Sequence, residues 1–126
     1  MGRWRNGRGR LHIEGGGADG TGGAVPLEIA TSYRARTRGL LGRDGIEGAL
    51  LLSPASSVHT FRMRFPIDVA YLDGKLRVIG VHTMKPGRMG APRLRARHVL
   101  ESEAGTMAGW GLRPGTRVHV EERNSG

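Results

Sequence analysis

The 126-residue chain contains no cysteine and only six aromatic residues, two each of Trp, Tyr and Phe. The absence of cysteine excludes disulfide bonds, zinc–thiolate sites and thiol catalysis. With so few aromatic rings, the core has to be built mainly from aliphatic side chains. No apolar run approaches the roughly 18 residues of a membrane-spanning helix, and the N-terminus lacks the apolar segment of a secretory signal. We therefore expect a cytoplasmic chain without a membrane span.

Glycine and arginine are abundant. Glycine accounts for 22 residues, well above the ordinary share of about 7%, and so many glycines favour turns and short strands over long helices. The formal net charge is +9, and 18 of the 20 basic residues are arginine. These arginines are scattered without interleaved aromatic residues or a recognisable nucleic-acid-reading motif. Specific nucleic-acid binding is therefore not favoured, although the charge permits it.

The segment 58–83 carries the clearest structural signal. Two β-branched runs are joined by Asp73-Gly74, a dipeptide typical of a two-residue hairpin turn. In that register Val69 opposes Val78 and Asp68 opposes Ile79. Both faces of the hairpin are then apolar apart from Asp68, which predicts a sheet that is covered on both sides.

Asp68 is the most informative single residue in this segment. A carboxylate on an apolar face needs a cation or several hydrogen-bond donors. We therefore predict that Asp68 is buried, ionised and partnered. The cationic partners within reach in the sequence are His59, Arg62, Arg64, Arg38 and Arg43.

The remaining pattern predicts a mainly β domain. Besides the hairpin, strands are expected at 9–14, 25–30, 49–52, 97–101 and 116–120. One short helix, capped by Thr31 or Ser32, is expected to run to Leu41, with Tyr33 facing inward. Residues 104–110 form a turn or a short helix. The fold class is thus a small antiparallel β-sandwich or β-barrel of about seven or eight short strands with one short helix.

The composition of the two terminal segments and of one glycine-rich loop indicates how the chain is divided. Residues 1–8 are expected to form a poorly ordered basic arm, 9–122 a single β domain, and 123–126 a tail. The loop 15–23 contains a G-x-G-x-x-G pattern, but a strand follows it where a phosphate-binding loop would open a helix. The loop is therefore interpreted as a flexible connector, and no cofactor is predicted.

Three blocks of the sequence resemble a known bacterial family. They are YRARTRGLLGR at 33–43, HTFRMRFPIDV at 59–69, and Val99-Leu100-Glu101 followed by Ala104-Gly105 and Gly111-Leu112. Their order and spacing over residues 25–120 are similar to those of the domain of unknown function 192 (DUF 192) family. The chain lacks the Trp and Asn of that family's usual F-W-M-x-N-T-x-I-P-L-D segment, and has Pro114-Gly115-Thr116 where a Gly-Asp pair is common. The resemblance implies a small, mostly antiparallel β fold and no activity.

The candidate site residues are His59, Asp68, Arg38, Arg43 and Glu101. Each also has a plainer structural interpretation. Asp68 could hold a loop through backbone N–H groups, and His59 could be a half-exposed strand histidine. The two arginines could be solvated, or Arg43 could pair with a carboxylate, while Glu101 could be a solvated acid at a strand end. The five histidines form no i,i+2 or i,i+4 cluster, so no metal is predicted.

Three classes of function remain open. The favoured one is a binding module that holds a small polar or anionic ligand, or a partner, in a cleft lined by arginines, His59 and Asp68. The second is a hydrolase- or lyase-type enzyme that uses His59 and Asp68 for acid–base chemistry. The third is a basic nucleic-acid-associated protein. The sequence assigns no catalytic residue.

Overall fold

The computed structural model describes residues 4–17 and 23–123. Within these ranges the elements follow in the order β1 (Gly7–Ile13), β2 (Val25–Ala30), α1 (Tyr33–Arg38), β3 (Ala49–Leu52), β4 (Ile67–Leu72), β5 (Val78–Met84), β6 (His98–Glu103), α2 (Thr106–Trp110) and β7 (Val118–Glu122). Neither described helix has the length and apolar character needed to cross a membrane. The predicted mainly β fold is confirmed.

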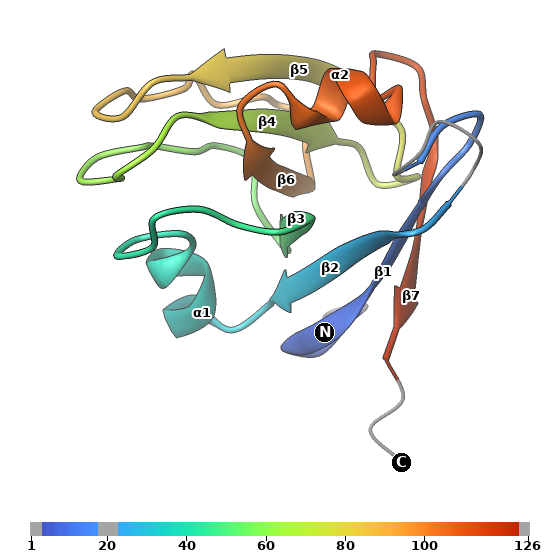
Figure 1. The fold of residues 1–126 in the computed structure, drawn as a ribbon, viewed down its shortest axis with the longest axis horizontal. Helices are drawn as coiled ribbons and strands as arrows, with labels where there is room; N and C mark the ends of the chain where they lie inside the picture. Colours follow the sequence, from blue (N-terminus) through green and yellow to red (C-terminus); the bar gives the residue numbers. More distant parts are fainter. Residues whose placement is uncertain (1–3, 18–22, 124–126) are drawn as a thin grey trace.

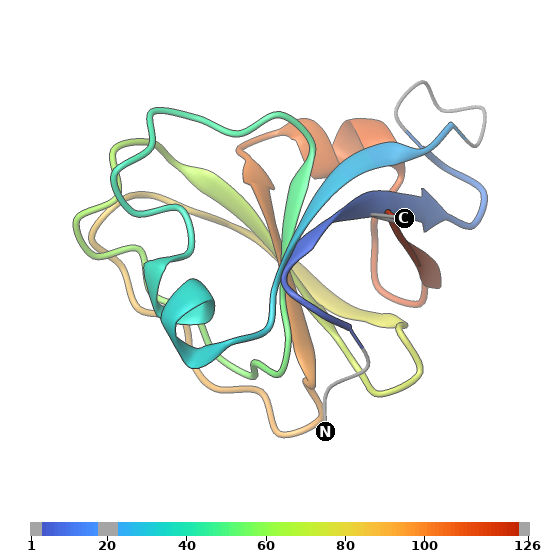
Figure 2. The same cartoon turned by 90° about the horizontal axis from the view of Figure 1, so that it is seen from below.

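The described strands form one seven-stranded sheet in the order β5-β4-β6-β3-β2-β1-β7. All neighbouring strands are antiparallel except β2 and β3, which are parallel. The sheet is strongly curled: β4 and β5 lie across the view of Figure 1 while β1 and β7 lie roughly along its vertical direction, and Figure 2 shows the strands fanning out from the middle of the molecule.

The two ends of this sheet meet at one point. The N–H of Val78 donates to the carbonyl of Thr116 at 2.8 Å, and the N–H of Val118 donates to the carbonyl of Leu76 at 2.9 Å. These bonds join the start of β5 to the start of β7. The fold is therefore a curled half-barrel rather than a sandwich of two sheets.

Apolar side chains cover both faces of the sheet, as the hairpin pattern predicted. The α2-side core packs strand residues such as Leu72 and Leu100 with Met107 and Trp110 of α2. The α1-side core packs strand residues on the opposite face with side chains from the connections after α1 and β3; its members include Leu40, Leu52, Met63, Val69 and Val99. Successive side chains of a strand point to opposite faces. Asp68 therefore faces the α2 side and Glu101 faces the α1 side.

The turn between β4 and β5 is longer than predicted. The side chain of Asp73 accepts hydrogen bonds from the N–H groups of Lys75 and Arg77, both at 2.9 Å. The positive φ, 64°, falls on Leu76 and not on Gly74. Asp73-Gly74 does stand in a hairpin turn, but the side chain of the aspartate builds a larger turn than the two-residue type.

This larger turn shifts the strand register. Asp68 pairs with Thr83 rather than Ile79, and Val69 pairs with His82, after an irregularity in the ladder near the turn. Both predicted pairs were therefore wrong, because register follows loop length. The assignment of faces along β4 was unaffected, since it depends only on the alternation within that strand.

Helix α1 begins as predicted and ends earlier. The hydroxyl of Ser32 caps its first turn. The helix stops at Gly39, whose φ of 48° and ψ of −126° belong to a region that glycine alone adopts readily. Tyr33 was expected to face inward but is 79% exposed, because the buried contact is supplied by Leu40, beyond the helix end.

The N-terminal residues contact the sheet before β1 begins. Trp4 packs against the α2-side core, with its ring 5.1 Å from that of His98. The side-chain oxygen of Asn6 accepts the backbone N–H of Thr31 at 2.6 Å. Strand β1 starts at Gly7, inside the stretch predicted as an arm. The predicted division at residues 8 and 122 stays a prediction; 1–3, 18–22 and 124–126 lie outside the described residues.

Candidate functional site

Asp68 is a buried carboxylate with three hydrogen-bond donors. It is 3% exposed, and Oδ1 accepts the hydroxyl of Thr83 at 2.7 Å. Oδ2 accepts the backbone N–H groups of Gly105 at 2.8 Å and Met107 at 3.1 Å. Burial and partnering of Asp68 are thus confirmed, but its partners are a hydroxyl and the start of α2, and not the cations named from the sequence. The residue clamps β4, β5 and α2 together.

Glu101 is buried on the opposite face without such partners. It is 3% exposed and pairs with Leu50 on one side and Val69 on the other, in the middle of the sheet. Burial raises its pKa from 4.5 to about 7. Its carboxyl group receives no hydrogen bond and forms no ion pair in the part of the chain described here. The interpretation of Glu101 as a solvated strand-end acid was wrong, because β6 continues to Glu103.

A small cavity of about 90 Å³ lies over Glu101. Its lining comes from three segments that are far apart in the chain: the end of α1 and the residues after it, the end of β3 with the connection to β4, and β6. The lining residues are Arg36, Thr37, Arg38, Gly39, Leu40, Leu41, Leu52, Ser57, Val58, His59, Met63 and Glu101. We call this space the Glu101 cavity.

Gly39 brings the chain close to the acid. A Cβ built on this residue would lie 3.8 Å from Oε1 of Glu101. The same residue ends α1 with its positive φ, so the last residues of the helix and the cavity wall are positioned by one turn. The short helix thereby delivers Arg36 and Arg38 to the site.

Two predicted site residues join Glu101 at this cavity. Arg38 is exposed, and no described residue accepts a hydrogen bond from its guanidinium group. His59 is also exposed and stacks on Phe61, with ring centroids 5.1 Å apart. The cavity therefore combines a buried acid with a cation and an imidazole near its opening. At a pKa near 7 the carboxyl group either accepts or donates a hydrogen bond at neutral pH.

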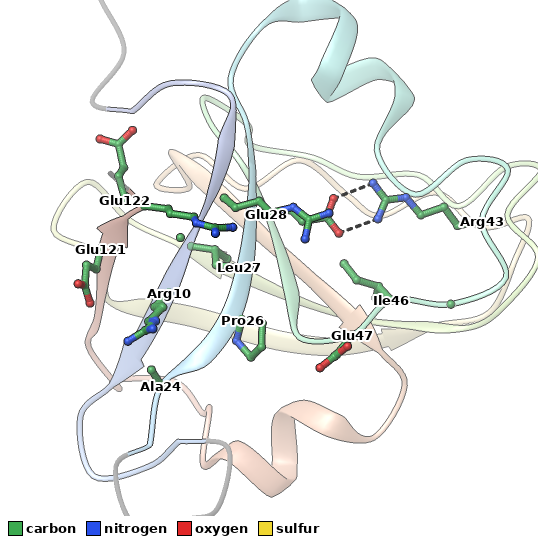
Figure 3. Close-up of a pocket in the computed structure, with 14 residues that line it drawn as sticks. Arg10, Ala24, Pro26, Leu27, Glu28, Arg43, Ile46, Glu47, Glu121 and Glu122 are labelled. Carbon is green, nitrogen blue, oxygen red and sulfur yellow. Dashed lines mark hydrogen bonds and ion pairs between the residues drawn. The ribbon is translucent and has the colours of Figure 1, made fainter. Parts of the chain in front are cut away.

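Arg43 is directed elsewhere. Its guanidinium makes two bonds to the carboxylate of Glu28, at 2.7 and 2.8 Å, which Figure 3 shows as a fork-like pair. This hydrogen bonding lowers the pKa of Glu28 and raises that of Arg43. The pair lies at the wall of a larger depression of about 1010 Å³ beside β1, β2 and β7. Both glutamates and arginines line this depression, and none of its glutamates is buried.

The predicted acid–base pair is not assembled. The carboxylate of Asp68 accepts hydrogen bonds from N–H groups on the α2 side, whereas His59 lies with the α1-side core. Three of the five candidates, Arg38, His59 and Glu101, meet at one cavity. Asp68 and Arg43 do not line it. No three His, Asp or Glu side chains within residues 4–17 and 23–123 gather as a metal-binding group.

The sequence prediction missed other residues of the cavity. Arg36 was not among the candidate site residues, but its Nε donates to the carbonyl of Thr31 at 3.2 Å and its Nη1 to that of Pro54 at 3.0 Å. Ser57 and Met63 had no stated role. Both lie in or next to the family-like second block, which was the available signal.

The model of the DUF192 family, described as an uncharacterised ACR, matches residues 17–120. The chain belongs to the DUF192 family. In this DUF192 chain the three blocks that suggested the resemblance all contribute to the wall of the Glu101 cavity.

Relatives and solved structures agree with the family and the fold. A UPF0127 protein of Pyrococcus horikoshii is 34% identical over 84 residues, covering 63% of this chain and 73% of the relative. One from Thermococcus sibiricus is 28% identical over 107 residues, covering 79% and 70%. Both organisms are archaea, so a bacterial origin of this DUF192 chain stays a prediction.

Two crystal structures share the fold. One, from Sinorhizobium meliloti and provisionally described as a transcription regulator, has a TM-score of 0.73 at 20% identity and covers 94% of this chain and 97% of its own. The other, a Novosphingobium aromaticivorans protein of unknown function, has a TM-score of 0.69 at 19% identity and covers 87% and 83%. At these identities the likeness concerns the fold alone.

Proposed function

We propose that this DUF192 chain is a binding module for a small polar ligand that enters the Glu101 cavity. The observation that carries the proposal is the buried, unpartnered carboxyl group of Glu101 at the wall of a cavity. An unpaired buried polar group costs about 1–3 kcal/mol, and more when charged. A ligand with a hydroxyl, amine or amide group offsets that cost, because its donor pairs with the carboxylate.

The size and polarity of the cavity narrow the ligand. A volume of about 90 Å³ is well below the roughly 300–1,000 Å³ of pockets for drug-sized molecules, so only a few non-hydrogen atoms fit inside. Arg38 and His59 near the opening favour an acceptor or anionic group outside the cavity. The best match is a small molecule with a hydrogen-bond donor at one end and an acceptor or an anion at the other.

The other two functions considered from the sequence are less well supported. The proposed acid–base chemistry required His59 and Asp68 to act together, and Asp68 serves as a clamp on the other face of the sheet. Association with nucleic acid rests on net charge alone and stays a prediction.

A thermal-shift screen tests the proposal. The wild type is screened with small alcohols, amines, amides and their acidic derivatives beside Glu101→Gln and the matched control Glu47→Gln, which makes the same change at an exposed residue. A true ligand raises the melting temperature of the wild type and of the control, because binding stabilises the folded state. The shift should disappear in Glu101→Gln. Compounds that stabilise all three proteins equally, or none of them, count against the Glu101 cavity as the site.

A further inference from the structure

A second, larger cavity adjoins the Glu101 cavity. It measures about 630 Å³ and shares four lining residues with it, Arg36, Thr37, Leu52 and Ser57. Its charged lining residues are Arg36, Arg93 and Arg97, and no Asp or Glu lines it. We call it the arginine groove. Its charge is thus of one sign, unlike the mixed charge of the depression in Figure 3.

Neutral acceptors hold two of these guanidinium groups in place. Arg36 donates to the backbone carbonyls of residues 31 and 54. Arg97 donates from Nη1 to the carbonyls of Leu94 at 3.0 Å and Ala96 at 3.1 Å. The ion pairs of the described residues, His12–Glu121, Arg43–Glu28 and Arg64–Asp44, involve none of the groove arginines. Both side chains are therefore positioned while their charge stays unneutralised.

Arg93 adds an unfilled donor. Its Nη2 lies 2.6 Å from Nε2 of His82, and its guanidinium carbon lies 5.1 Å from the centre of the Tyr71 ring. Its Nε is buried and has no hydrogen-bond partner. Buried donors of this kind are rare in folded proteins. The guanidinium group of Arg93 is held by His82 and Tyr71, and none of the ion pairs of the described residues neutralises its charge.

The rim of the groove offers apolar surface and hydroxyl groups. Tyr33 is 79% exposed and Leu94 is 96% exposed, although both are large apolar side chains. Ser56 and Ser57 contribute hydroxyls to the lining. A phosphate group carries a charge of about −2 and three acceptor oxygens, so it can engage several guanidinium groups and a hydroxyl at once. A carboxylate is matched by a single arginine fork.

We propose that the arginine groove binds the phosphate group of a small organic phosphate whose polar end occupies the Glu101 cavity. The proposal rests on the proposed function and specifies the class of its ligand. The anion sits among Arg36, Arg93 and Arg97, and the carbon chain passes the shared wall formed by Thr37, Leu52 and Ser57. The hydroxyl end then reaches Glu101.

The first experiment measures the groove alone, with inorganic phosphate as the probe. Phosphate replaces chloride in steps at constant ionic strength. The NMR chemical shifts of the backbone amides then give the dissociation constant of phosphate for the wild type, Arg97→Gln and the control Arg95→Gln. Arg95 is exposed, lies in the same loop and does not line the groove. We expect about tenfold weaker binding in Arg97→Gln, the usual loss for one charge-assisted bond, and no change in the control. Equal weakening of phosphate binding in both variants, or no saturable binding by the wild type, would contradict the arginine groove as the phosphate site.

The second experiment uses glycerol 3-phosphate and separates the two proposals. The wild type should bind it more tightly than inorganic phosphate, and Glu101→Gln should abolish that gain while binding inorganic phosphate normally. If Glu101→Gln still binds glycerol 3-phosphate more tightly than inorganic phosphate, the Glu101 cavity is not the site of the polar end, while the arginine groove remains the phosphate site. If Arg97→Gln binds glycerol 3-phosphate as tightly as the wild type does, the arginine groove is not the phosphate site. A single-stranded oligonucleotide that displaces phosphate with an affinity rising with its length would overturn the small-molecule assignment in favour of nucleic acid.

Discussion

Asp68 and Glu101 stand on neighbouring strands of one sheet and have opposite surroundings. The carboxylate of Asp68 accepts three hydrogen bonds, whereas the carboxyl group of Glu101 has no described donor and a pKa raised by burial. A buried acid with donors stabilises a fold, and one without donors is a cost that a ligand removes. The number of hydrogen-bond donors around each acid therefore indicates a structural role for Asp68 and a binding role for Glu101.

Glu101 should make the stability of the protein depend on pH. A folded-state pKa of about 7, against 4.5 in the unfolded chain, means that the folded state binds this proton more tightly. Its contribution is fully present below about pH 4.5 and is lost as the pH rises through 7. Relative to Glu101→Gln, the wild type should lose about 3 kcal/mol of unfolding free energy over that window. Urea unfolding of both proteins at several pH values measures this, and a constant difference would contradict it.

Asp68→Asn should destabilise the protein at neutral pH. The amide oxygen can still accept the N–H groups of Gly105 and Met107, with its NH2 group toward the hydroxyl of Thr83, but the bonds to an ionised carboxylate are then replaced by weaker bonds to a neutral amide. We expect a cost of about 1–3 kcal/mol in chemical denaturation. Asp44→Asn is the matched control, since Asp44 makes only an exposed pair with Arg64 and such pairs contribute little. A neutral or stabilising Asp68→Asn would show that this acid is kept for a function.

At the scale of elements, a short helix sets the geometry of the site. α1 has six residues, too few for an independently stable helix, and it buries none of them. It is held by the Ser32 cap at one end and by the backbone of Gly39 at the other. The cavity wall therefore depends on two local turns more than on helix packing.

Gly39→Ala should test that dependence. A Cβ at a φ of 48° and a ψ of −126° is strained whatever space surrounds it, with an expected cost of about 1–3 kcal/mol. Gly109→Ala provides the comparison, because Gly109 lies inside α2 and a Cβ there meets nothing within 4 Å. That variant should be neutral or up to about 1 kcal/mol more stable, since alanine favours helix. Thermal unfolding of the two proteins should therefore give shifts of different sign or size.

The sequence predicted the elements well and the connections less well. The β-branched pattern identifies β4, because that signal is local. The larger turn at Asp73 could not be predicted, since whether that side chain turns back onto the backbone depends on the strands it joins. The burial of Glu101 was missed for a similar reason: a Glu after Val99 and Leu100 looks like a strand end until β3 and β4 are placed on either side.

At the scale of the whole molecule, the curled sheet needs its N-terminal strand and the residues before it. Trp4 is half-buried against the α2-side core and touches His98. Trp4→Ala should therefore lower the unfolding free energy by roughly 1–3 kcal/mol through lost apolar contact. Arg5→Ala, an exposed neighbour whose described bond comes from its backbone N–H, should change it little. Unfolding in urea measures both, and an unchanged midpoint in Trp4→Ala would support the predicted separate arm at residues 1–8.

Which residues meet at the Glu101 cavity was predictable only in part, because that depends on the fold of the whole chain. Arg38, His59 and Glu101 come from three segments, and the sequence alone could not show that the sheet order brings them to one cavity. The face of Asp68 was predictable from alternation, but its partners near α2 were not, because they lie more than 35 residues further along the chain. The arginine groove was likewise hidden among scattered arginines.

The pairing of β1 with β7 also bears on how the protein is made. His12 pairs with His119, so β1 is synthesised long before its partner β7. At the usual rates of synthesis the outer edge of β1 waits roughly 5–20 s before β7 exists. During that time it is an open template for another nascent chain, and Arg8 and Arg10 are exposed on it. Like charges on an open strand edge oppose pairing with a second copy, and this protection is no longer needed once β7 has paired with β1.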